Sequence, residues 1–292
     1  MIDRILFPTD GSDGAAIALD HVLDVARTHD ATLHVLNVAD TRVHSATRVG
    51  LEIVDALETQ GEAIVTEAAE TAGDRGVSTV TDVLQGGVPE TIVDYADEYG
   101  MDLVVMPTRG RTGLRRLLIG SVTERVLRTS TIPVLTINPD ATPFRYPYER
   151  VLVPTDGSET ADDALEMGVD IATLHDAGLH VLSVVDVTSL GVDVYSEVQV
   201  DTLEDQAATV IEEATAYARN QSVASVEGVI EHGSAVHRAI RSYVDEHDVD
   251  LVVMGTHGRS GLDRYLLGSV AEKIVRTAAV PVLTVPGHRS DQ

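Results

Sequence analysis

Short apolar runs alternate along the chain with longer segments in which apolar residues recur every three or four positions. In the first half, the short runs predict strands at residues 4–7, 32–38, 79–84, 102–106 and 134–137. Most of these runs are apolar throughout, which is typical of strands that are covered on both faces. The longer segments predict helices at residues 13–28, 51–72, 89–98 and 121–128. Strands that alternate with helices indicate a doubly wound α/β domain with a parallel sheet.

The second half of the chain repeats the first. The run RILFPTDGS at residues 4–12 recurs as RVLVPTDGS at residues 150–158. Further along, DLVVM at residues 102–106 recurs at residues 250–254. Collinear matches over such a length indicate a duplicated domain, with the same order of strands and helices in each copy.

We therefore predict two tandem domains, at residues 1–138 and 150–286, each with a five-stranded parallel sheet flanked by helices. Three prolines lie close together between them, which is typical of a linker at residues 139–149. Residues 287–292 form a short tail. In a sheet of this kind, ligands bind at the carboxyl ends of the strands, where the strand order reverses.

Composition narrows the class of protein. The chain has 292 residues, of which 43% are apolar, so it can bury two cores and is not a disordered protein. It contains no cysteine, which excludes disulfides and thiolate metal sites. The first residues enter a strand pattern without a signal-peptide pattern, and no apolar run has the length of a membrane span. We therefore expect a soluble, cytoplasmic protein.

The charge balance is strongly acidic. The chain has 47 acidic and 21 basic residues, a net charge of −26, and Lys273 is its single lysine. Because nucleic acids and anionic membranes attract basic surfaces, we expect neither among the partners. Such a surface is solubilising in any protein. We also put forward the hypothesis of a halophilic source, since abundant salt screens the repulsion.

A glycine-rich loop follows the apolar run at residues 250–254. Gly255 and Gly258 lie at its start, and Gly268 and Ser269 begin the next helical segment. Glycine lets backbone N–H groups approach an anion closely, and the start of a helix carries a partial positive charge. The loop is therefore a candidate phosphate cradle. The alternative is that its glycines satisfy only the geometry of a turn.

This spacing, together with the Pro-Thr-Asp turn after the first strand, resembles the nucleotide-binding signature of the universal stress protein family in its ATP-binding branch. The resemblance covers both halves. It implies that the loop and the following serine hold ribose and phosphates, while the aspartate and a valine of the second strand frame the adenosine. In the second half it implies a site formed by Pro154, Thr155, Asp156, Val181, Met254, Gly255, Gly258, Arg259, Gly268, Ser269 and Val270. The implied ligand is ATP, with Mg²⁺.

The first half departs from the signature at one position. Pro107 stands where the second half has Gly255, and proline fixes φ and has no N–H to donate. The residues that still match are Thr9, Asp10, Val35, Gly110, Gly120 and Ser121. We therefore predict that the second domain holds the more competent site and the first a weaker one.

Three functions remain open. The first is a stress-response protein that binds ATP as a regulatory or sensing ligand. The second is a slow ATPase or phosphotransferase, but neither loop has the Gly-Lys-Ser/Thr ending of a P-loop or any lysine. The third is a scaffold that binds no nucleotide. The sequence offers no catalytic residues, and His34 and His180 within strands favour hydrogen bonding over metal binding.

The resemblance also has implications for assembly. Domains of the family usually dimerise, so the two halves are expected to pack as an internal pseudo-dimer through their last strands, residues 134–137 and 282–285. Two chains can then associate as a homodimer. A signalling partner is expected, but the residues do not identify it.

Overall fold

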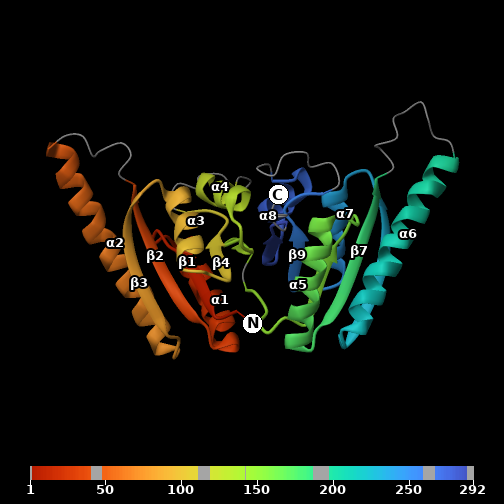
Figure 1. Ribbon diagram of the computed structural model, residues 1–292, viewed down its shortest axis with the longest axis horizontal. Helices are drawn as coiled ribbons and strands as arrows, with labels where there is room; N and C mark the ends of the chain where they lie inside the picture. Colours follow the sequence, from red (N-terminus) through yellow and green to blue (C-terminus); the bar gives the residue numbers. More distant parts are fainter. Residues whose placement is uncertain are drawn as a thin grey trace. The chain divides into compact units, whose positions relative to one another are not determined.

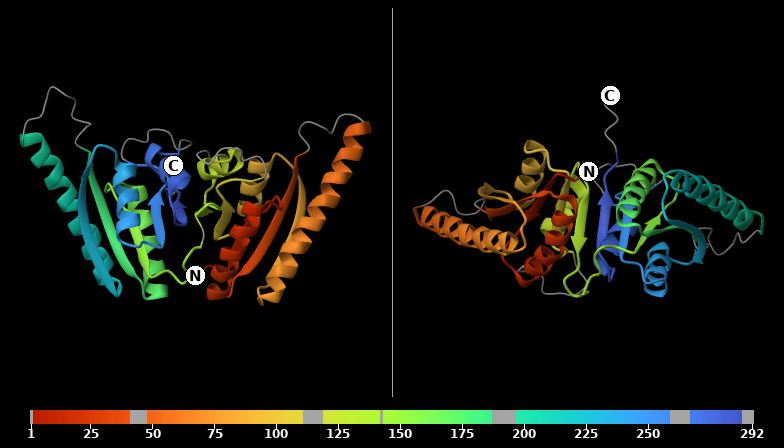
Figure 2. Two further views of the ribbon diagram at one scale, coloured as in Figure 1. Left: turned by 180° about the vertical axis from the view of Figure 1, so that it is seen from behind. Right: turned by 90° about the horizontal axis from the view of Figure 1, so that it is seen from below.

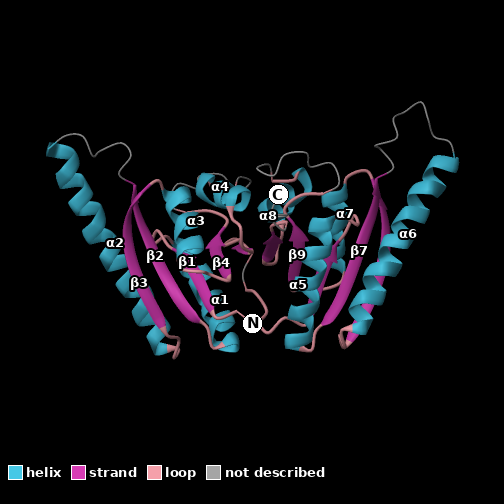
Figure 3. Ribbon diagram, viewed as in Figure 1, coloured by secondary structure: helices cyan, strands magenta, loops and turns pink. Residues whose placement is uncertain are grey.

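The computed structural model describes residues 2–40, 48–110, 119–141, 143–186, 197–258 and 267–287. The chain divides into two compact units, Met1–Asp140 and Ala141–Gln292 (Figure 1). Within each unit a sheet is covered by helices, as the colouring by secondary structure makes clear (Figure 3). None of the helices in these ranges is both long and apolar enough to cross a bilayer.

The first unit is a five-stranded parallel sheet in the order β3-β2-β1-β4-β5. Its strands are β1 (Arg4–Pro8), β2 (Thr32–Asp40), β3 (Thr79–Gly86), β4 (Leu103–Pro107) and β5 (Val134–Ile137). Its helices are α1 (Asp13–His29), α2 (Arg48–Asp74), α3 (Val88–Glu98) and α4 (Ser121–Thr129). This arrangement confirms the fold class expected from the alternating pattern.

The second unit has the same topology, in the order β10-β9-β6-β7-β8, again with every pair parallel. Its strands are β6 (Arg150–Pro154), β7 (Gly178–Asp186), β8 (Ser225–Gly233), β9 (Leu251–Gly255) and β10 (Val282–Val285). Its helices are α5 (Glu159–His175), α6 (Glu197–Asn220), α7 (Val236–Glu246) and α8 (Ser269–Thr277). The structure therefore confirms the internal repeat.

The order of strands decides which helices lie together. From β1 the chain moves outward to β2 and β3, and it then returns past β1 to β4 and β5. Because crossovers between parallel strands are right-handed, the first two helices cover one face of the sheet and the last two cover the other. Accordingly, α3 packs against α4, α5 against α6, and α7 against α8. The view from below shows the two helical layers (Figure 2). The central strands are buried on both faces, and Ile5, Leu6 and Phe7 are fully inaccessible.

Local chemistry sets the ends of α1. Ser12 caps its start by accepting a hydrogen bond from the Ala15 N–H at 3.2 Å. At its end, Asp30 adopts a left-handed conformation with φ of 53°, which aspartate tolerates better than most residues. Asp176 ends α5 in the same way with φ of 55°. The helix boundaries therefore follow from short-range rules in both units.

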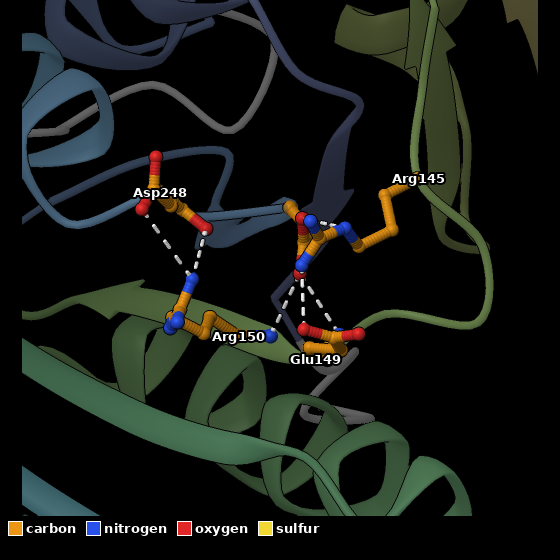
Figure 4. Close-up of polar contacts among 5 residues, drawn as sticks. Arg145, Glu149, Arg150 and Asp248 are labelled. Atoms are coloured by element: carbon orange, nitrogen blue, oxygen red, sulfur yellow. Dashed lines mark hydrogen bonds and ion pairs between the residues drawn. The ribbon is translucent and has the colours of Figure 1, made fainter.

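The amino-terminal edge of each sheet is tied by one aspartate, which is buried in the second unit (Asp250) and exposed in the first (Asp102). Asp250 Oδ2 accepts hydrogen bonds from the Glu149 and Arg150 N–H groups at 2.8 and 2.9 Å, and Arg145 approaches its other oxygen (Figure 4). Arg150 in turn donates to the Asp248 carbonyl. Asp102 binds the N–H groups at the start of β1 in the same manner. The opposite, carboxyl-terminal edge is left for ligand chemistry.

Candidate nucleotide-binding site

The site lies at the carboxyl ends of β1 and β4, which are neighbouring strands. From β1 the chain passes outward to β2 and β3 on one side, and it then returns to form β4 on the other side of β1. The pairing of Ile5 with Leu103 and of Leu6 with Val104 shows that these strands are neighbours. The turn after β1 and the loop after β4 therefore meet at one crevice, at the point where the strand order reverses. The pairing of β6 with β9 repeats this geometry in the second unit.

The turn after β1 is built by its own side chains. Thr9 Oγ1 accepts a hydrogen bond from the Gly11 N–H at 3.2 Å, and Asp10 Oδ1 accepts one from the Ser12 N–H at 3.0 Å. Gly11 has φ of 69°, a conformation that favours glycine. These bonds orient the carboxylate of Asp10 toward the crevice.

The second unit repeats this turn almost atom for atom. Thr155 Oγ1 accepts from the Gly157 N–H at 3.1 Å, and Asp156 Oδ1 accepts from the Ser158 N–H at 3.1 Å. Pro154, at the end of β6, is half-buried and directs the chain into the turn. The Pro-Thr-Asp sequence therefore has a structural role in both units besides any contact with a ligand.

The loop glycines press against these carboxylates. A Cβ on Gly110 would collide with Asp10 Oδ2, and a Cβ on Gly258 would lie 2.6 Å from Asp156 Oδ2. A larger residue at this position would therefore displace the carboxylate of the neighbouring aspartate. The glycine holds the loop after β4 or β9 directly over the aspartate turn.

The helix that follows each loop begins without a side-chain cap. Gly120 and Gly268 are the N-cap residues, and their N–H groups donate to the carbonyls of Thr108 and Thr256 at 2.8 Å. Within the described ranges, no side-chain cap bonds to the first N–H groups of α4 or α8. Uncapped N–H groups at a helix start form an anion-binding position. Ser121 and Ser269 occupy the first helical residue there.

In the first unit these parts surround a cavity of about 220 Å³. It is lined by residues from the ends of β1, β2 and β4, one side of α3 and the start of α4. They are Pro8, Thr9, Asp10, Leu36, Asn37, Val38, Val88, Ile92, Met106, Pro107, Gly110, Gly120, Ser121, Val122 and Thr123. The lining is apolar toward α3 and polar toward the turn and the helix start, which is typical of a small-molecule site.

Five of the six residues predicted for the first half reach this cavity, but Val35 does not. Val35 is 1% exposed and pairs with Phe7 inside the sheet, whereas Val38 stands at the carboxyl end of β2 and lines the cavity. The sequence prediction therefore placed the valine three residues too early. Val181 occupies the same core position in the second unit, and Val184 is the counterpart of Val38. Taking the last apolar residues of the strand would have found Val38.

Asn37 also lines the cavity and was missed by the sequence analysis. Its Nδ2 donates to the Thr9 carbonyl at 2.7 Å, so it ties the end of β2 to the aspartate turn. The second unit has Ser183 at this position. The one sequence signal was a polar residue between the apolar Leu36 and Val38 near the end of the strand.

The predicted residues of the second unit gather at the equivalent place. Met254 is buried at the end of β9, while Ser269 is exposed and Val270 half-buried at the start of α8. Gly255 serves a packing role, because a Cβ there would lie 2.7 Å from the Thr160 carbonyl oxygen. Arg259 lies outside the described residues.

The strand histidines make hydrogen bonds, as expected. His34 Nδ1 lies 2.9 Å from Tyr95 Oη, and that hydroxyl donates to Asp82 at 2.6 Å. Burial, and then the hydrogen bond to Asp82, raise the pKa of Tyr95 above its usual value. His180 contacts Tyr243 Oη at 2.8 Å in the second unit. The described part of the chain contains no cluster of three or more residues suited to hold a metal ion.

Comparison with known proteins concerns both halves of the chain. The model of the universal stress protein family matches residues 1–138 and 147–286. A universal stress protein of Methanocaldococcus jannaschii is 35% identical over 141 residues, which are 46% of this chain and 81% of that protein. A universal stress protein of Mycobacterium bovis is 30% identical over 237 residues, 77% of each chain.

Among solved structures, a universal stress protein from Archaeoglobus fulgidus superposes with a TM-score of 0.77 at 22% identity, over 98% of each chain. This similarity concerns the fold. Since the family model accounts for nearly all of both units, the chain belongs to the universal stress protein family.

Proposed function

We propose that this protein is a cytoplasmic stress-response protein that binds an adenine nucleotide, with ATP as the leading ligand, for sensing or regulation. The observation that carries the proposal is the cavity at the switch point of the first unit, which joins an apolar wall, a carboxylate and an uncapped helix start. This combination matches the three chemical parts of a nucleotide: a flat base, a ribose with hydroxyls, and phosphates.

Each part of the ligand has a partner in the cavity. The base would lie between the ends of β2 and β4, against Val38 and Met106. The carboxylate of Asp10 would accept hydrogen bonds from the ribose hydroxyls. The phosphates would lie at the start of α4, where the N–H groups of Ser121 and Val122 have no side-chain cap. Mg²⁺ would arrive with the phosphates, since no cluster of protein ligands is present among the described residues.

The lining favours binding over phosphoryl transfer. It offers one carboxylate and no lysine, arginine or histidine within the described residues. Arg109, next to the loop glycine, is engaged by Asp140 and by Asn138. The net charge of −26 repels a polyanion at long range, so affinity would come from these local groups.

Calorimetric titration of the full chain with Mg·ATP tests the proposal, and paired variants assign the site. Asp10→Asn and Asp156→Asn each replace the carboxylate by an amide, whose oxygen can still accept the hydrogen bond of the turn, but they remove the charge. We expect the variant of an occupied unit to bind about tenfold more weakly, the effect of losing one charge-assisted hydrogen bond. A chain that binds no adenine nucleotide contradicts the proposal and favours a scaffold.

The same titration measures the preference between units. The expectation that the second site is stronger stays a prediction, and a larger effect of Asp156→Asn would support it. Release of phosphate during the titration, abolished by the same variant, would add slow hydrolysis to the function.

A further inference from the structure

An arginine joins α1 to the end of α2 in the first unit. Arg75, directly after α2, pairs with Asp20 and lies 3.7 Å from Asp24, both on α1. Its guanidinium also donates to the Asp20 carbonyl at 3.4 Å. One side-chain cation therefore pairs with two carboxylates at the junction between the two helices.

The second unit keeps the carboxylates and lacks the cation. The counterparts of Asp20 and Asp24 are Glu166 and Asp170, but the counterpart of Arg75 is Gln221. The backbone has the same course at this position, because the N–H of Gln221 donates to Ala218 at 3.1 Å just as that of Arg75 donates to Ala72 at 3.1 Å. The change is therefore one of charge and not of fold.

Further acidic and aromatic groups are added at the same junction. Asp162 replaces Ala16 of the first unit, Tyr217 replaces Thr71, and Glu213 corresponds to Glu67. Burial, together with Asp163, Glu213, Asp156 and Glu166, raises the pKa of the Asp162 carboxyl. Within the described ranges, none of the ion pairs includes Asp162, Glu166, Asp170 or Glu213.

These groups line an open cavity of about 480 Å³ between α5 and α6, which lies within the usual size range of small-molecule sites, about 300–1,000 Å³. Its lining combines apolar side chains of Leu165, Val210 and Ala214 with three carboxylates and the Tyr217 ring, and it reaches Thr155 and Gly157 of the turn after β6. An aliphatic chain fits against such apolar side chains. A cation can pair with the carboxylates and contact the face of the ring.

We propose that the groove between α5 and α6 binds a small aliphatic polycation, an amine or a guanidine, whose charged groups pair with Asp162, Glu166 and Glu213. The ligand takes the place that the Arg75 guanidinium has in the first unit. A bare metal ion fits less well, because no metal-binding cluster occurs among the described residues. Anionic ligands are repelled by the three carboxylates.

Titration calorimetry on the full chain tests this, with spermidine and agmatine as probes, in KCl sufficient to keep the protein folded. We expect one saturable site per chain. The triple variant Asp162→Asn, Glu166→Gln, Glu213→Gln should bind at least tenfold more weakly. The matched control Asp55→Asn, Glu62→Gln, Glu70→Gln removes the same charge from exposed positions of α2 and should bind as the unmodified chain does.

A second variant supplies the missing cation from the protein itself. Gln221→Arg restores the residue of the first unit and should weaken polycation binding at least tenfold by competing for Glu166. Because spermidine carries one more positive charge than agmatine, saturable binding of either probe that both variants weaken supports the proposal. Equal weakening by the control triple, or no saturable binding of either probe, would overturn the proposal.

Discussion

Thr160 and Gly255 form a matched pair in which the backbone of one occupies the space that a side chain on the other would need. A Cβ on Gly255 would lie 2.7 Å from the Thr160 carbonyl oxygen and 3.0 Å from its Cβ. In the first unit Gly14 is the counterpart of Thr160, and Pro107 is the counterpart of Gly255. The glycine therefore stands at the other position of the pair. A Cβ on Gly14 would in turn lie 2.9 Å from the Arg109 carbonyl oxygen.

Gly287 in the second unit also packs against Thr160. A Cβ on Gly287 would lie 2.6 Å from Thr160 Cγ2, while its counterpart in the first unit is Pro139, close to Gly14. The first unit therefore places Pro139 beside Gly14, and the second places Gly255 and Gly287 beside Thr160. The difference between Gly255 and Pro107 is thus accompanied by a change in packing, and a stronger second site stays a prediction.

A substitution at Thr160 should partly compensate for the loss of stability caused by a substitution at Gly255. Gly255→Ala alone should destabilise the second unit by about 1–3 kcal/mol, because the added methyl group overpacks against Thr160. Adding Thr160→Gly removes only the side chain, so it should recover part of that loss by freeing the backbone to move. Urea unfolding measures both, with Gly73→Ala as the control, since a Cβ there meets nothing within 4 Å. Strictly additive effects would contradict the pairing.

Gly61 packs closely against Asn37, which lines the candidate cavity. A Cβ on Gly61 would lie 2.6 Å from Asn37 Oδ1, and the second unit has Ala207 and Ser183 at these positions. Gly61→Ala should therefore destabilise the first unit by about 1–3 kcal/mol through overpacking. Combining it with Asn37→Ser should restore part of the stability, because the contact with Asn37 is relieved while that with Val83 Cγ1 at 2.9 Å stays and the bond to the Thr9 carbonyl is lost. If the double variant is no more stable than Gly61→Ala in urea, the two positions do not compensate.

The stability of the first unit should fall in mild acid because of His21. Burial lowers the pKa of His21 from 6.5 to about 4, although Asp20 partly opposes the shift. Between these values the unfolded chain binds a proton that the folded chain does not, so stability falls as the pH is lowered through this range. The free energy of unfolding falls by on the order of 3 kcal/mol once the pH lies below both pKa values.

Methionine is the natural control at this position, because Met167 is the counterpart of His21 in the second unit. Urea unfolding of His21→Met between pH 7 and pH 4 should show a smaller loss of stability in the first unit than the unmodified chain. An identical pH dependence of the two proteins would assign the acid sensitivity to other groups.

The acidic surface predicts a dependence on salt. With a net charge of −26, self-repulsion should weaken the fold at low ionic strength. Molar KCl shortens the screening length to about 3 Å and should raise the thermal unfolding temperature markedly above its value in dilute buffer. Circular dichroism melts over a KCl series measure this. A melting temperature that does not change on removing salt would sink the halophilic hypothesis.

The sequence by itself determined the elements, their order, the duplication and the aspartate turn. These features depend on residues close in the chain: apolar runs that form buried strands, Ser12 that caps α1, and the Thr-Asp-Gly turn that satisfies its own backbone. Short-range rules suffice for all of this. The sequence left open whether β1 and β4 are neighbours, and the register shows that they pair.

Only the tertiary structure decided which side chains meet. How far a strand residue lies below the carboxyl edge depends on the neighbouring strand, so the register with β1 placed Val35 in the core and Val38 at the cavity. The packing role of Gly255 and the loss of the Arg75 cation opposite Glu166 involve residues distant in sequence. Hydrophobic periodicity carries no information on such contacts, because they depend on distances that arise only when the chain folds.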